Sequence, residues 1–346
     1  NGGRLDWSRD NVIVFDRPGS DGYFDIYTIR PDGSGETCLT CGPRPGFPLR
    51  HKGNPAWHPS GQYIAFQAQK LGLSGPTIDP LANPGSGLNN DLWVMDRNGT
   101  RAWRMTNTLP LEGGVLHPHF SPAGDRLLWS ERVAPGGRYG EWVLRLADFG
   151  VDAEGPRIDT VRTYQPGAQR RFYEPHGFSL DGRRILFSGN LEPGQDELFI
   201  DIYWMDLETQ ALVDLTPAPG EWDEHAQLSP SGDRIVWMSS LGAPVRPQVG
   251  ALQTDYWIMN ADGSNKARLT HFNDRTHPEY IPGGVIAADS AWSPDGSRLA
   301  GYLITDPKRV LGRIVLIDVG MPTGAAAAAA AEPEARNPAL PSPRGM

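Results

Sequence analysis

One short pattern recurs six times along the chain, and this recurrence constrains the fold more than any other feature. The pattern starts with an aromatic residue or leucine, continues with Ser in five copies and with Pro after that position in four, and then has a Gly- or Asp-containing turn and an alternating apolar run. The six first residues, here called the anchors, are Trp7, Trp57, Phe120, Phe178, Leu228 and Trp292. Consecutive anchors lie 50 to 64 residues apart, and periods of this order indicate a repeat architecture.

A second pattern follows each anchor and reads as a strand, a short turn and a strand that ends in Leu-Thr or Met-Thr. Its clear copies start at Asp25, Asp91, Asp201 and Asp255, and degraded copies start at Glu141 and Gly312. Alternation with a period of two gives each strand one buried face. The Pro and Gly residues supply the backbone angles that tight turns need. Each repeat therefore predicts about four antiparallel strands.

Such four-stranded units leave both faces apolar, and packing them radially buries those faces. We predict an all-β fold, a six-bladed β-propeller of four-stranded antiparallel blades, with the anchors wedged between neighbouring blades. The single propeller spans residues 1–320, with blades near 4–43, 53–107, 117–165, 174–217, 224–271 and 288–320. The last blade lacks a clear fourth strand after Asp318, so ring closure could borrow a strand from either terminus. Residues 321–346 are rich in Ala and Pro and predict a flexible tail.

These repeats resemble the PD40, or WD40-like, repeats of TolB-like six-bladed propellers over about residues 5–320. The resemblance implies the fold, and it implies a periplasmic or extracellular protein because the family is usually exported. The chain begins with Asn1 instead of Met, which we interpret as a processed form. The resemblance leaves function open, because such propellers serve as binding proteins, as peptidase accessory domains and as enzymes.

Charge and composition narrow the classes of partner. The formal net charge of −9 disfavours nucleic acid, because phosphate binding requires a basic face. No run of about 18 apolar residues occurs, so we expect no membrane span. Without a Walker A or dinucleotide fingerprint, we expect no nucleotide cofactor. The remaining partners are another protein or an anionic small molecule such as a sugar acid.

The two cysteines leave three interpretations open. Cys38 and Cys41 lie three residues apart in a Cys-Leu-Thr-Cys-Gly segment. They could form a local disulfide or stay free thiols, form half of a metal site with His51, or act as a redox pair.

Histidines gather immediately before several anchors. His117 and His119 precede Phe120, and His225 and Gln227 precede Leu228, at positions whose parity is opposite to that of the buried anchor. These side chains should therefore face the central tunnel. Two interpretations stay open, namely a water-filled polar tunnel and a site for one divalent metal ion, Mn, Zn or Ca. The residues that would orient the metal ligands from outside are Asp223, Glu224 and Asp289.

A set of three His and one Gln resembles the metal site of oligogalacturonate lyases, which are metal-dependent propeller enzymes. This resemblance implies His117, His119, His225 and Gln227 as ligands, with β-elimination on a uronate as the reaction. The candidate catalytic residues are Arg170, Arg171, Glu174 and His176. Whether the chain is an enzyme stays open at this stage.

Long loops supply the remaining candidates. The connections between second and third strands, and between successive blades, are long and emerge at one end of an up-and-down blade, and loops on a rigid scaffold often carry function. The candidate ligand-binding residues are Asn54, Tyr173, Trp222, His277 and Tyr280. The leading hypothesis is an exported propeller that binds a protein partner or small ligand on this face, with a metal at the tunnel mouth. The alternatives are a metal-dependent polysaccharide or oligouronide lyase or hydrolase, and a structural subunit of an extracellular assembly.

Overall fold

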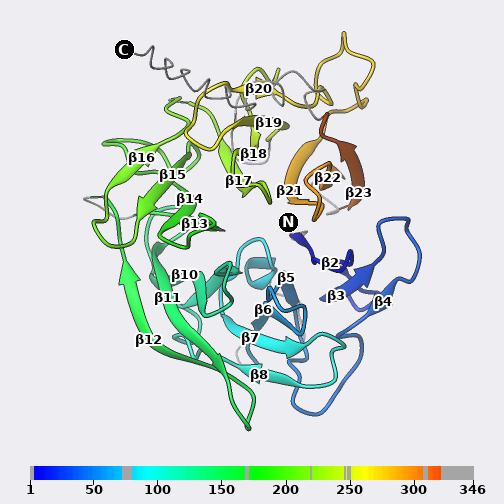
Figure 1. The fold of residues 1–346 in the computed structure, drawn as a ribbon, viewed down its shortest axis with the longest axis vertical. Coiled ribbons are helices and arrows are strands. Elements are labelled where there is room, and N and C mark those ends of the chain that lie inside the picture. Colours follow the sequence, from blue (N-terminus) through cyan, green and yellow to red (C-terminus); the bar gives the residue numbers. More distant parts are fainter. Residues whose placement is uncertain are drawn as a thin grey trace, which may run out of the picture.

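The structure of the protein is a computed structural model, and it describes residues 4–71, 80–167, 171–218, 220–244, 247, 251–306 and 311–320. Six antiparallel sheets are arranged in a ring around a central axis (Figure 1). The predicted six-bladed, all-β propeller is therefore confirmed. The predicted tail, residues 321–346, lies outside the described residues.

The strands follow chain order from the axis outward in every blade. Blades 1 to 3 consist of β1 (Leu5–Trp7), β2 (Ile13–Pro18), β3 (Phe24–Ile29), β4 (Thr37–Cys38), β5 (Lys52–Trp57), β6 (Tyr63–Gln69), β7 (Asn90–Asp96), β8 (Ala102–Arg104), β9 (Gly114–Phe120), β10 (Arg126–Ala134), β11 (Glu141–Val151) and β12 (Pro156–Tyr164). Blades 4 to 6 consist of β13 (Tyr173–Phe178), β14 (Arg184–Gly189), β15 (Asp201–Asp206), β16 (Leu212–Asp214), β17 (Asp223–Leu228), β18 (Arg234–Ser239), β19 (Asp255–Asn260), β20 (Ala267–Arg268), β21 (Ile286–Trp292), β22 (Arg298–Asp306) and β23 (Leu311–Asp318). One 3-10 turn, η1 (Pro80–Ala82), lies between β6 and β7.

The ring closes by packing between its two ends. Blade 6 has three strands in the described part of the chain, and no strand from one terminus joins the sheet of the other there. Instead Leu5, Trp7 and Phe15 of blade 1 share an apolar cluster with Ala291 and Tyr302 of blade 6. Side-chain burial, not a shared sheet, therefore holds the first and last blades together.

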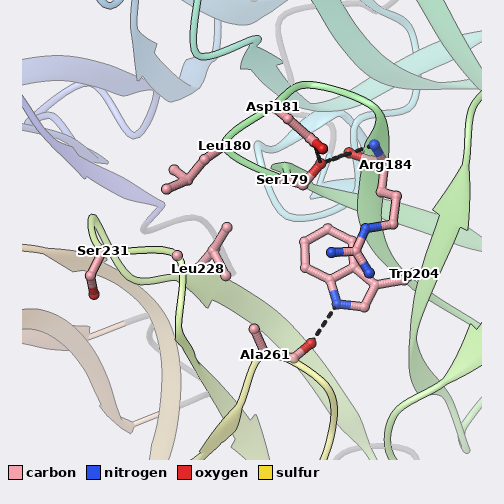
Figure 2. A pocket seen from close by; sticks show the side chains of 9 residues that line it. Ser179, Leu180, Asp181, Arg184, Trp204, Leu228, Ser231 and Ala261 are labelled. Atoms are coloured by element: carbon pink, nitrogen blue, oxygen red, sulfur yellow. Dashed lines mark hydrogen bonds between the residues drawn. The ribbon is translucent and has the colours of Figure 1, made fainter. Parts of the chain in front are cut away.

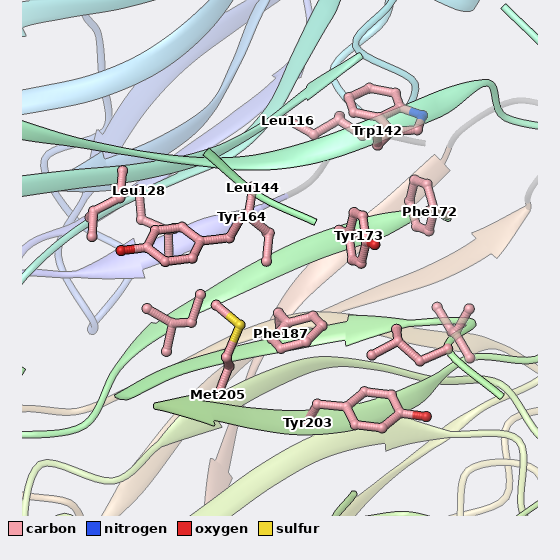
Figure 3. Packing of buried hydrophobic residues seen from close by; sticks show 14 of the residues in the cluster. Leu116, Leu128, Trp142, Leu144, Tyr164, Phe172, Tyr173, Phe187, Tyr203 and Met205 are labelled. Atoms are coloured by element: carbon pink, nitrogen blue, oxygen red, sulfur yellow. The ribbon is translucent and has the colours of Figure 1, made fainter. Parts of the chain in front are cut away.

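The anchors lie between blades as predicted. Each of six apolar clusters joins two neighbouring blades, and each contains or packs against one anchor. Figure 3 shows the cluster between blades 3 and 4, where Trp142 and Leu144 face Tyr173, Phe187 and Tyr203. Burying a large apolar side chain contributes about 1.5–3 kcal/mol, so these clusters are the main source of stability between blades.

A serine follows the anchor and closes the first turn in five blades, whereas His58 takes this position in blade 2. In blades 3 to 6 the serine hydroxyl oxygen accepts a hydrogen bond from the backbone N–H five residues later, at 2.9 to 3.1 Å. This local bond explains why the pattern combines Ser with a turn containing Gly, such as Gly124 with its φ of 77°. The turns are short on this face of the ring, here called the short-turn face.

Bulges in the inner strands position the side chains on the axis. The pairing of β5, β9, β13, β17 and β21 with the next strand shifts register a few residues before the anchor in each blade. In three of them a non-glycine residue has a positive φ at the bulge, namely Asn54 (51°), His117 (50°) and His225 (52°). A bulge inserts one extra residue and redirects its side chain. His117 and His225 thereby face residues of other blades, whereas Asn54 bonds to Gln67 of its own blade.

Two further features answer questions left open by the sequence. Cys38 and Cys41 form a disulfide, which excludes free thiols or a thiolate metal site in this state. Among the described residues, no helix is long and apolar enough to cross a membrane.

Candidate functional site

Three inner strands bring two histidines and a carboxylate together on the axis. One ligand atom each from His117 (β9), Glu174 (β13) and His225 (β17) lies within 4.8 Å of the other two. Glu174 Oε1 is 2.6 Å from His117 Nε2 and 3.5 Å from His225 Nδ1. All three side chains are almost wholly buried. We call these three residues the axial triad.

Two more carboxylates surround His225. Asp289 Oδ1 lies 2.9 Å from its Nδ1, and Glu224 Oε2 lies 3.4 Å from its Nε2. Glu224 also accepts a hydrogen bond from Trp222 Nε1 at 2.8 Å. Burial alone would lower the pKa of His225, but Asp289, Glu224 and Glu174 together raise this pKa to about 10.

The other groups respond to the same crowding of negative charge. Burial, together with Glu174, raises the pKa of Glu224 well above its ordinary value. Burial would also raise the pKa of Asp289, but the charge of His225 holds that pKa below its ordinary value. Burial lowers the pKa of His117 to about 3. Three buried carboxyl groups thus lie around His225, and the raised pKa of Glu224 favours its neutral form, because burying an unpaired charge is costly.

The axial triad has the ligand atoms of a metal site, and two of these atoms are not engaged in a hydrogen bond of ordinary geometry. Glu174 Oε1 and His225 Nδ1 are buried and make no hydrogen bond of ordinary geometry, although His117 Nε2 lies 2.6 Å from the first atom and Asp289 Oδ1 lies 2.9 Å from the second. Buried polar atoms without hydrogen bonds are rare and require an explanation. Two imidazoles and one carboxylate are a ligand set for zinc and for other divalent transition metals. The residues present therefore fit such an ion.

Arg4 crosses the axis on the short-turn side of the triad. Its Nη1 donates to Pro118 O at 2.9 Å and its Nη2 lies 2.8 Å from His119 Nδ1. Because arginine can only donate, His119 Nδ1 must accept, and His119 Nε2 must donate to Pro175 O, 3.0 Å away. Both ring nitrogens of His119 are thus occupied, and this histidine offers no lone pair to the triad.

The sequence analysis missed Arg4, although a signal was present. Arg4 stands three residues before Trp7, as His117 does before Phe120, His225 before Leu228 and Asp289 before Trp292. The position that faces the axis is therefore the third residue before each anchor in these blades. In blade 4 the bulge lies at His176, and Glu174 reaches the triad instead.

The remaining proposed metal ligands and supporting residues lie apart from the triad. Gln227 lines a depression on the short-turn face together with Asp6 and Trp292. Asp223 accepts a hydrogen bond from Trp237 Nε1 at 3.0 Å, and burial raises its pKa to about 7. The structure thus brings together His117 and His225 of the proposed ligands, and Glu224 and Asp289 of the proposed supporting residues.

The proposed catalytic residues differ in their placement. Glu174 belongs to the axial triad. His176 is buried beside it, with Nε2 2.8 Å from Ser188 Oγ and its ring 6.1 Å from that of His225. Arg171 is buried, and its Nη2 donates to Leu191 O at 3.3 Å. Arg170 lies outside the described residues.

The proposed ligand-binding residues are also dispersed. Asn54 is buried and donates to Gln67 Oε1 at 2.8 Å, and Trp222 contacts Glu224 as described above. Tyr173 lies in the apolar cluster between blades 3 and 4. His277 stacks on His271 at 4.1 Å in the loop before β21, and the Tyr280 N–H donates to His277 O at 3.1 Å.

A shallow depression of about 250 Å³ opens on the short-turn face between blades 4 and 5 (Figure 2). Arg184 lies 4.8 Å from the ring of Trp204 there, and Leu180 and Leu228 form its apolar wall. Within the depression, the Ser179 hydroxyl donates to Asp181 Oδ1 at 2.6 Å, and this bond belongs to the first turn of blade 4. The lining of the depression is mixed polar and apolar, and it presents no set of groups suited to catalysis.

Comparison with known proteins supports the fold alone. No protein-family model and no curated protein matches the chain. Among solved structures, a proposed TolB from Agrobacterium tumefaciens has 19% identity and a TM-score of 0.57, with 87% of this chain and 88% of that chain covered. An oligogalacturonate lyase from Vibrio parahaemolyticus has 12% identity and a TM-score of 0.51, with coverage of 92% and 89%.

A puromycin-hydrolysing peptidase from Mycobacterium tuberculosis has 14% identity and a TM-score of 0.53 over 91% of this chain. The chain spans 51% of that peptidase. The expected resemblance to TolB-like six-bladed propellers is thus confirmed at the level of fold. These neighbours have different activities, so the fold does not select a function.

Proposed function

We propose that this TolB-like propeller is a binding protein whose axis holds one divalent transition-metal ion through His117, Glu174 and His225. The observation that carries the proposal is the convergence of one buried donor atom each from His117, Glu174 and His225, all within 4.8 Å of one another. Two nitrogen donors favour zinc or manganese over calcium, which prefers oxygen ligands.

The surrounding residues would support such a site in two ways. Glu224 lies 3.4 Å from His225 Nε2, the ring nitrogen that points away from Glu174, and carboxylates commonly orient metal-binding histidines through this second nitrogen. Asp289 Oδ1 lies 2.9 Å from Nδ1 itself, so it would compete with the ion for this nitrogen or become a further ligand. Arg4 closes the axis toward the short-turn face, so access would come from the long-loop face. A divalent ion would act as a Lewis acid with coordination positions left for a ligand. Together with Arg4 it would reverse the local charge, which favours an anionic small molecule or an acidic group of a protein partner.

The arrangement supports binding better than lyase chemistry. The lyase-like ligand set requires His119 and Gln227, yet His119 is held by Arg4 and Gln227 lines the short-turn face. The Cys38–Cys41 disulfide supports a site of action in an oxidising compartment, such as the periplasm or the exterior.

The test is metal content and metal affinity of the purified protein. We expect one zinc or manganese ion per chain, and an affinity more than about 100-fold lower in His117→Ala and His225→Ala. His277→Ala removes a loop histidine and should bind metal as the wild type does. Gln227→Ala discriminates between the axial triad and the lyase-like ligand set, which includes Gln227. This variant should also retain the metal. Absence of binding to the folded wild type after reloading would refute the proposal.

A further inference from the structure

Blade 1 departs from a rule that blades 2 and 5 follow at the outer strand. A buried aspartate stands near the start of the third strand in four blades, at Asp25, Asp91, Asp201 and Asp255, each at most 5% exposed. In blades 2 and 5 an arginine of the outer strand pairs with this aspartate, namely Arg104 and Arg268. Each arginine lies opposite the residue two positions after the aspartate.

In blade 1 the same register position holds a cysteine. Cys38 lies opposite Tyr27, two residues after Asp25, and it forms the disulfide with Cys41. The counter-charge of Asp25 comes from blade 2, because Lys52 Nζ lies 2.8 Å from Asp25 Oδ1. The outer strand of blade 1 therefore presents a disulfide where the other two blades present a cation.

The buried carboxylate of blade 1 lies close to both sulfur atoms. One oxygen of Asp25 and the sulfurs of Cys38 and Cys41 all lie within 4.8 Å of one another. Asp25 is only 5% exposed, whereas both cysteines are half-buried. A carboxylate at this distance can exchange a proton with a thiol through one water molecule. The disulfide therefore has a titratable group beside it, which a purely structural crosslink does not need.

Each sulfur also accepts a hydrogen bond. The backbone N–H of Cys41 donates to Cys38 Sγ at 3.0 Å. Tyr27 Oη lies 3.4 Å from Cys41 Sγ, and the tyrosine hydroxyl is the donor because a disulfide sulfur has no proton. The guanidinium of Arg17 lies 4.2 Å from the centre of the Tyr27 ring. Hydrogen-bond donors and nearby cations stabilise a thiolate, so these surroundings also suit the reduced pair.

We propose that Cys38–Cys41 is a redox-active disulfide that is reduced by a dithiol, with Asp25 as the proton carrier. The dithiol belongs either to a partner protein or to a small molecule. Cys41 is followed by the exposed Gly42 and Pro43, so a thiol can approach the pair from solvent. This activity is separate from metal binding on the axis.

The exchange conserves atoms and electrons. A thiolate of the dithiol attacks one sulfur of the pair, the protein S–S bond breaks, and the other sulfur leaves as a thiolate that its hydrogen-bond donor stabilises. The second thiol of the dithiol loses its proton and attacks the mixed disulfide, which frees the remaining cysteine and converts the dithiol to a disulfide. Two electrons pass to the protein, and the two protons of the dithiol end on Cys38 and Cys41 by way of Asp25.

Redox titration of the folded full chain tests the proposal. The protein is equilibrated in glutathione buffers, its free thiols are alkylated and counted by mass spectrometry, and circular dichroism follows the fold. We expect a measurable reduced fraction at about 5 mM glutathione, where a structural disulfide stays oxidised. A chelator in the buffer excludes a metal held by the two thiolates and Asp25, which the ammonium of Lys52 already disfavours. A pair that stays oxidised, or that is reduced only as the chain unfolds, would overturn the proposal.

Variants assign the roles of the neighbouring groups. Tyr27→Phe removes the donor to Cys41 and should lower the equilibrium constant for reduction about tenfold. Asp25→Asn/Lys52→Met removes the carboxylate without leaving an unpaired ammonium. It should slow re-oxidation by oxidised glutathione at least about tenfold near pH 6, and not near pH 9, where hydroxide takes the thiol proton.

The matched control removes the equivalent buried pair of blade 5. Asp255→Asn/Arg268→Met should leave both the equilibrium and the rate unchanged. If the blade 1 double variant slowed re-oxidation equally at both pH values, or if it re-oxidised as the wild type does, the proton-carrier role of Asp25 would be refuted and the proposal with it.

A comparison of two dithiols identifies the source of the electrons. The probes are dithiothreitol and a peptide with a Cys-Gly-Gly-Cys segment, each at the same concentration of thiolate. A larger rate constant for the peptide would support a protein dithiol as the partner, and a larger rate constant for dithiothreitol would support a small molecule. Failure of both dithiols to reduce the folded protein would contradict the redox role, whatever the metal content of the axis.

Discussion

Two positions of the repeat differ in how much their residue varies between blades. Comparing them separates residues that stabilise each blade from residues that make the blades different from one another. At the start of the third strand, four blades carry the same buried aspartate. At the inner-strand position three residues before the anchor, the blades carry Arg4, Asn54, His117, His225 and Asp289. The first position is almost uniform, and the second differs in nearly every blade.

The physical reason is the identity of the neighbours. An aspartate near the start of the third strand bonds to a threonine hydroxyl or backbone N–H of the following segment of its own blade, as Asp255 does with Thr270 and Phe272. Asp25 in addition pairs with Lys52 of blade 2. A side chain at the axis meets side chains of other blades, as Arg4 meets His119 and His225 meets Glu174. Uniform residues suit the first environment, whereas complementary residues are needed in the second.

Removal of the aspartate in blade 5 should have the largest effect on stability. Asp255→Ala leaves Arg268 mostly buried without its partner, and also removes the acceptor of the Thr270 hydroxyl and the Phe272 N–H. Loss of one member of a buried ion pair costs about 3–5 kcal/mol. We expect that decrease in the free energy of unfolding, measured by urea denaturation.

The matched control is Asp201→Ala in blade 4, where no cation loses its partner. We expect a smaller loss than in blade 5. Equal losses of unfolding free energy in the two blades would mean that the ion pair with Arg268 contributes no stability beyond the other contacts of the aspartate. The contrast between blades 4 and 5 would then disappear.

Blade 1 deviates from the pattern in another way, and the disulfide should have an intermediate effect. Cys38 lies opposite Tyr27, at the register position of Arg104 and Arg268, and is bonded to Cys41. Closing so short a loop restricts the unfolded chain by about 2 kcal/mol in the loop-entropy model. Reduction should lower the free energy of unfolding by up to that amount, and a Cys38→Ser/Cys41→Ser variant should not respond to the reductant. A wild type with the same stability in both redox states would contradict this role.

The same contrast explains what could be predicted from the sequence. Anchors, turn residues and alternating strands act locally, so the six blades and the packing of Trp7 or Trp292 between blades followed from the pattern. The bulges were not predicted, because Asn54, His117 and His225 adopt positive φ without being glycine. The alternation of side chains along a regular strand therefore predicted that His117 and His119 lie together on the axis. In the structure His119 contacts Arg4 instead.

Contacts between distant residues account for the rest. Glu174 reaches the triad because the bulge of blade 4 lies one residue later relative to its anchor, at His176. The pairing of Arg4 with His119 spans 115 residues and three blades of the ring, and no local pattern encodes it. The sequence predicts the candidate histidines, whereas only the three-dimensional structure shows which of them lie in contact.

The last prediction concerns the pH dependence of stability in blade 4, where the change is spread over several pH units. Burial and Asp214 raise the pKa of Asp201 to about 7 from an ordinary value of 3.8. Between about pH 4 and pH 7 the folded state therefore binds more protons at this site than the unfolded state does, and stability must fall as the pH rises. Asp201→Asn removes this dependence, which for one group is at most about 1.4 kcal/mol per pH unit, and it retains an acceptor for Gln195.

We expect the variant to gain stability relative to the wild type as the pH rises from 4 to 7, with no further gain above about pH 7.5. Denaturation curves at several pH values measure this difference, with Glu208→Gln as the exposed control of the same blade. Asp223, whose pKa burial also raises to about 7, remains in both proteins, so the variant should flatten the profile only in part. Parallel profiles for wild type and Asp201→Asn would show that a cation already neutralises Asp201, and blade 4 would then follow the same rule as blades 1, 2 and 5.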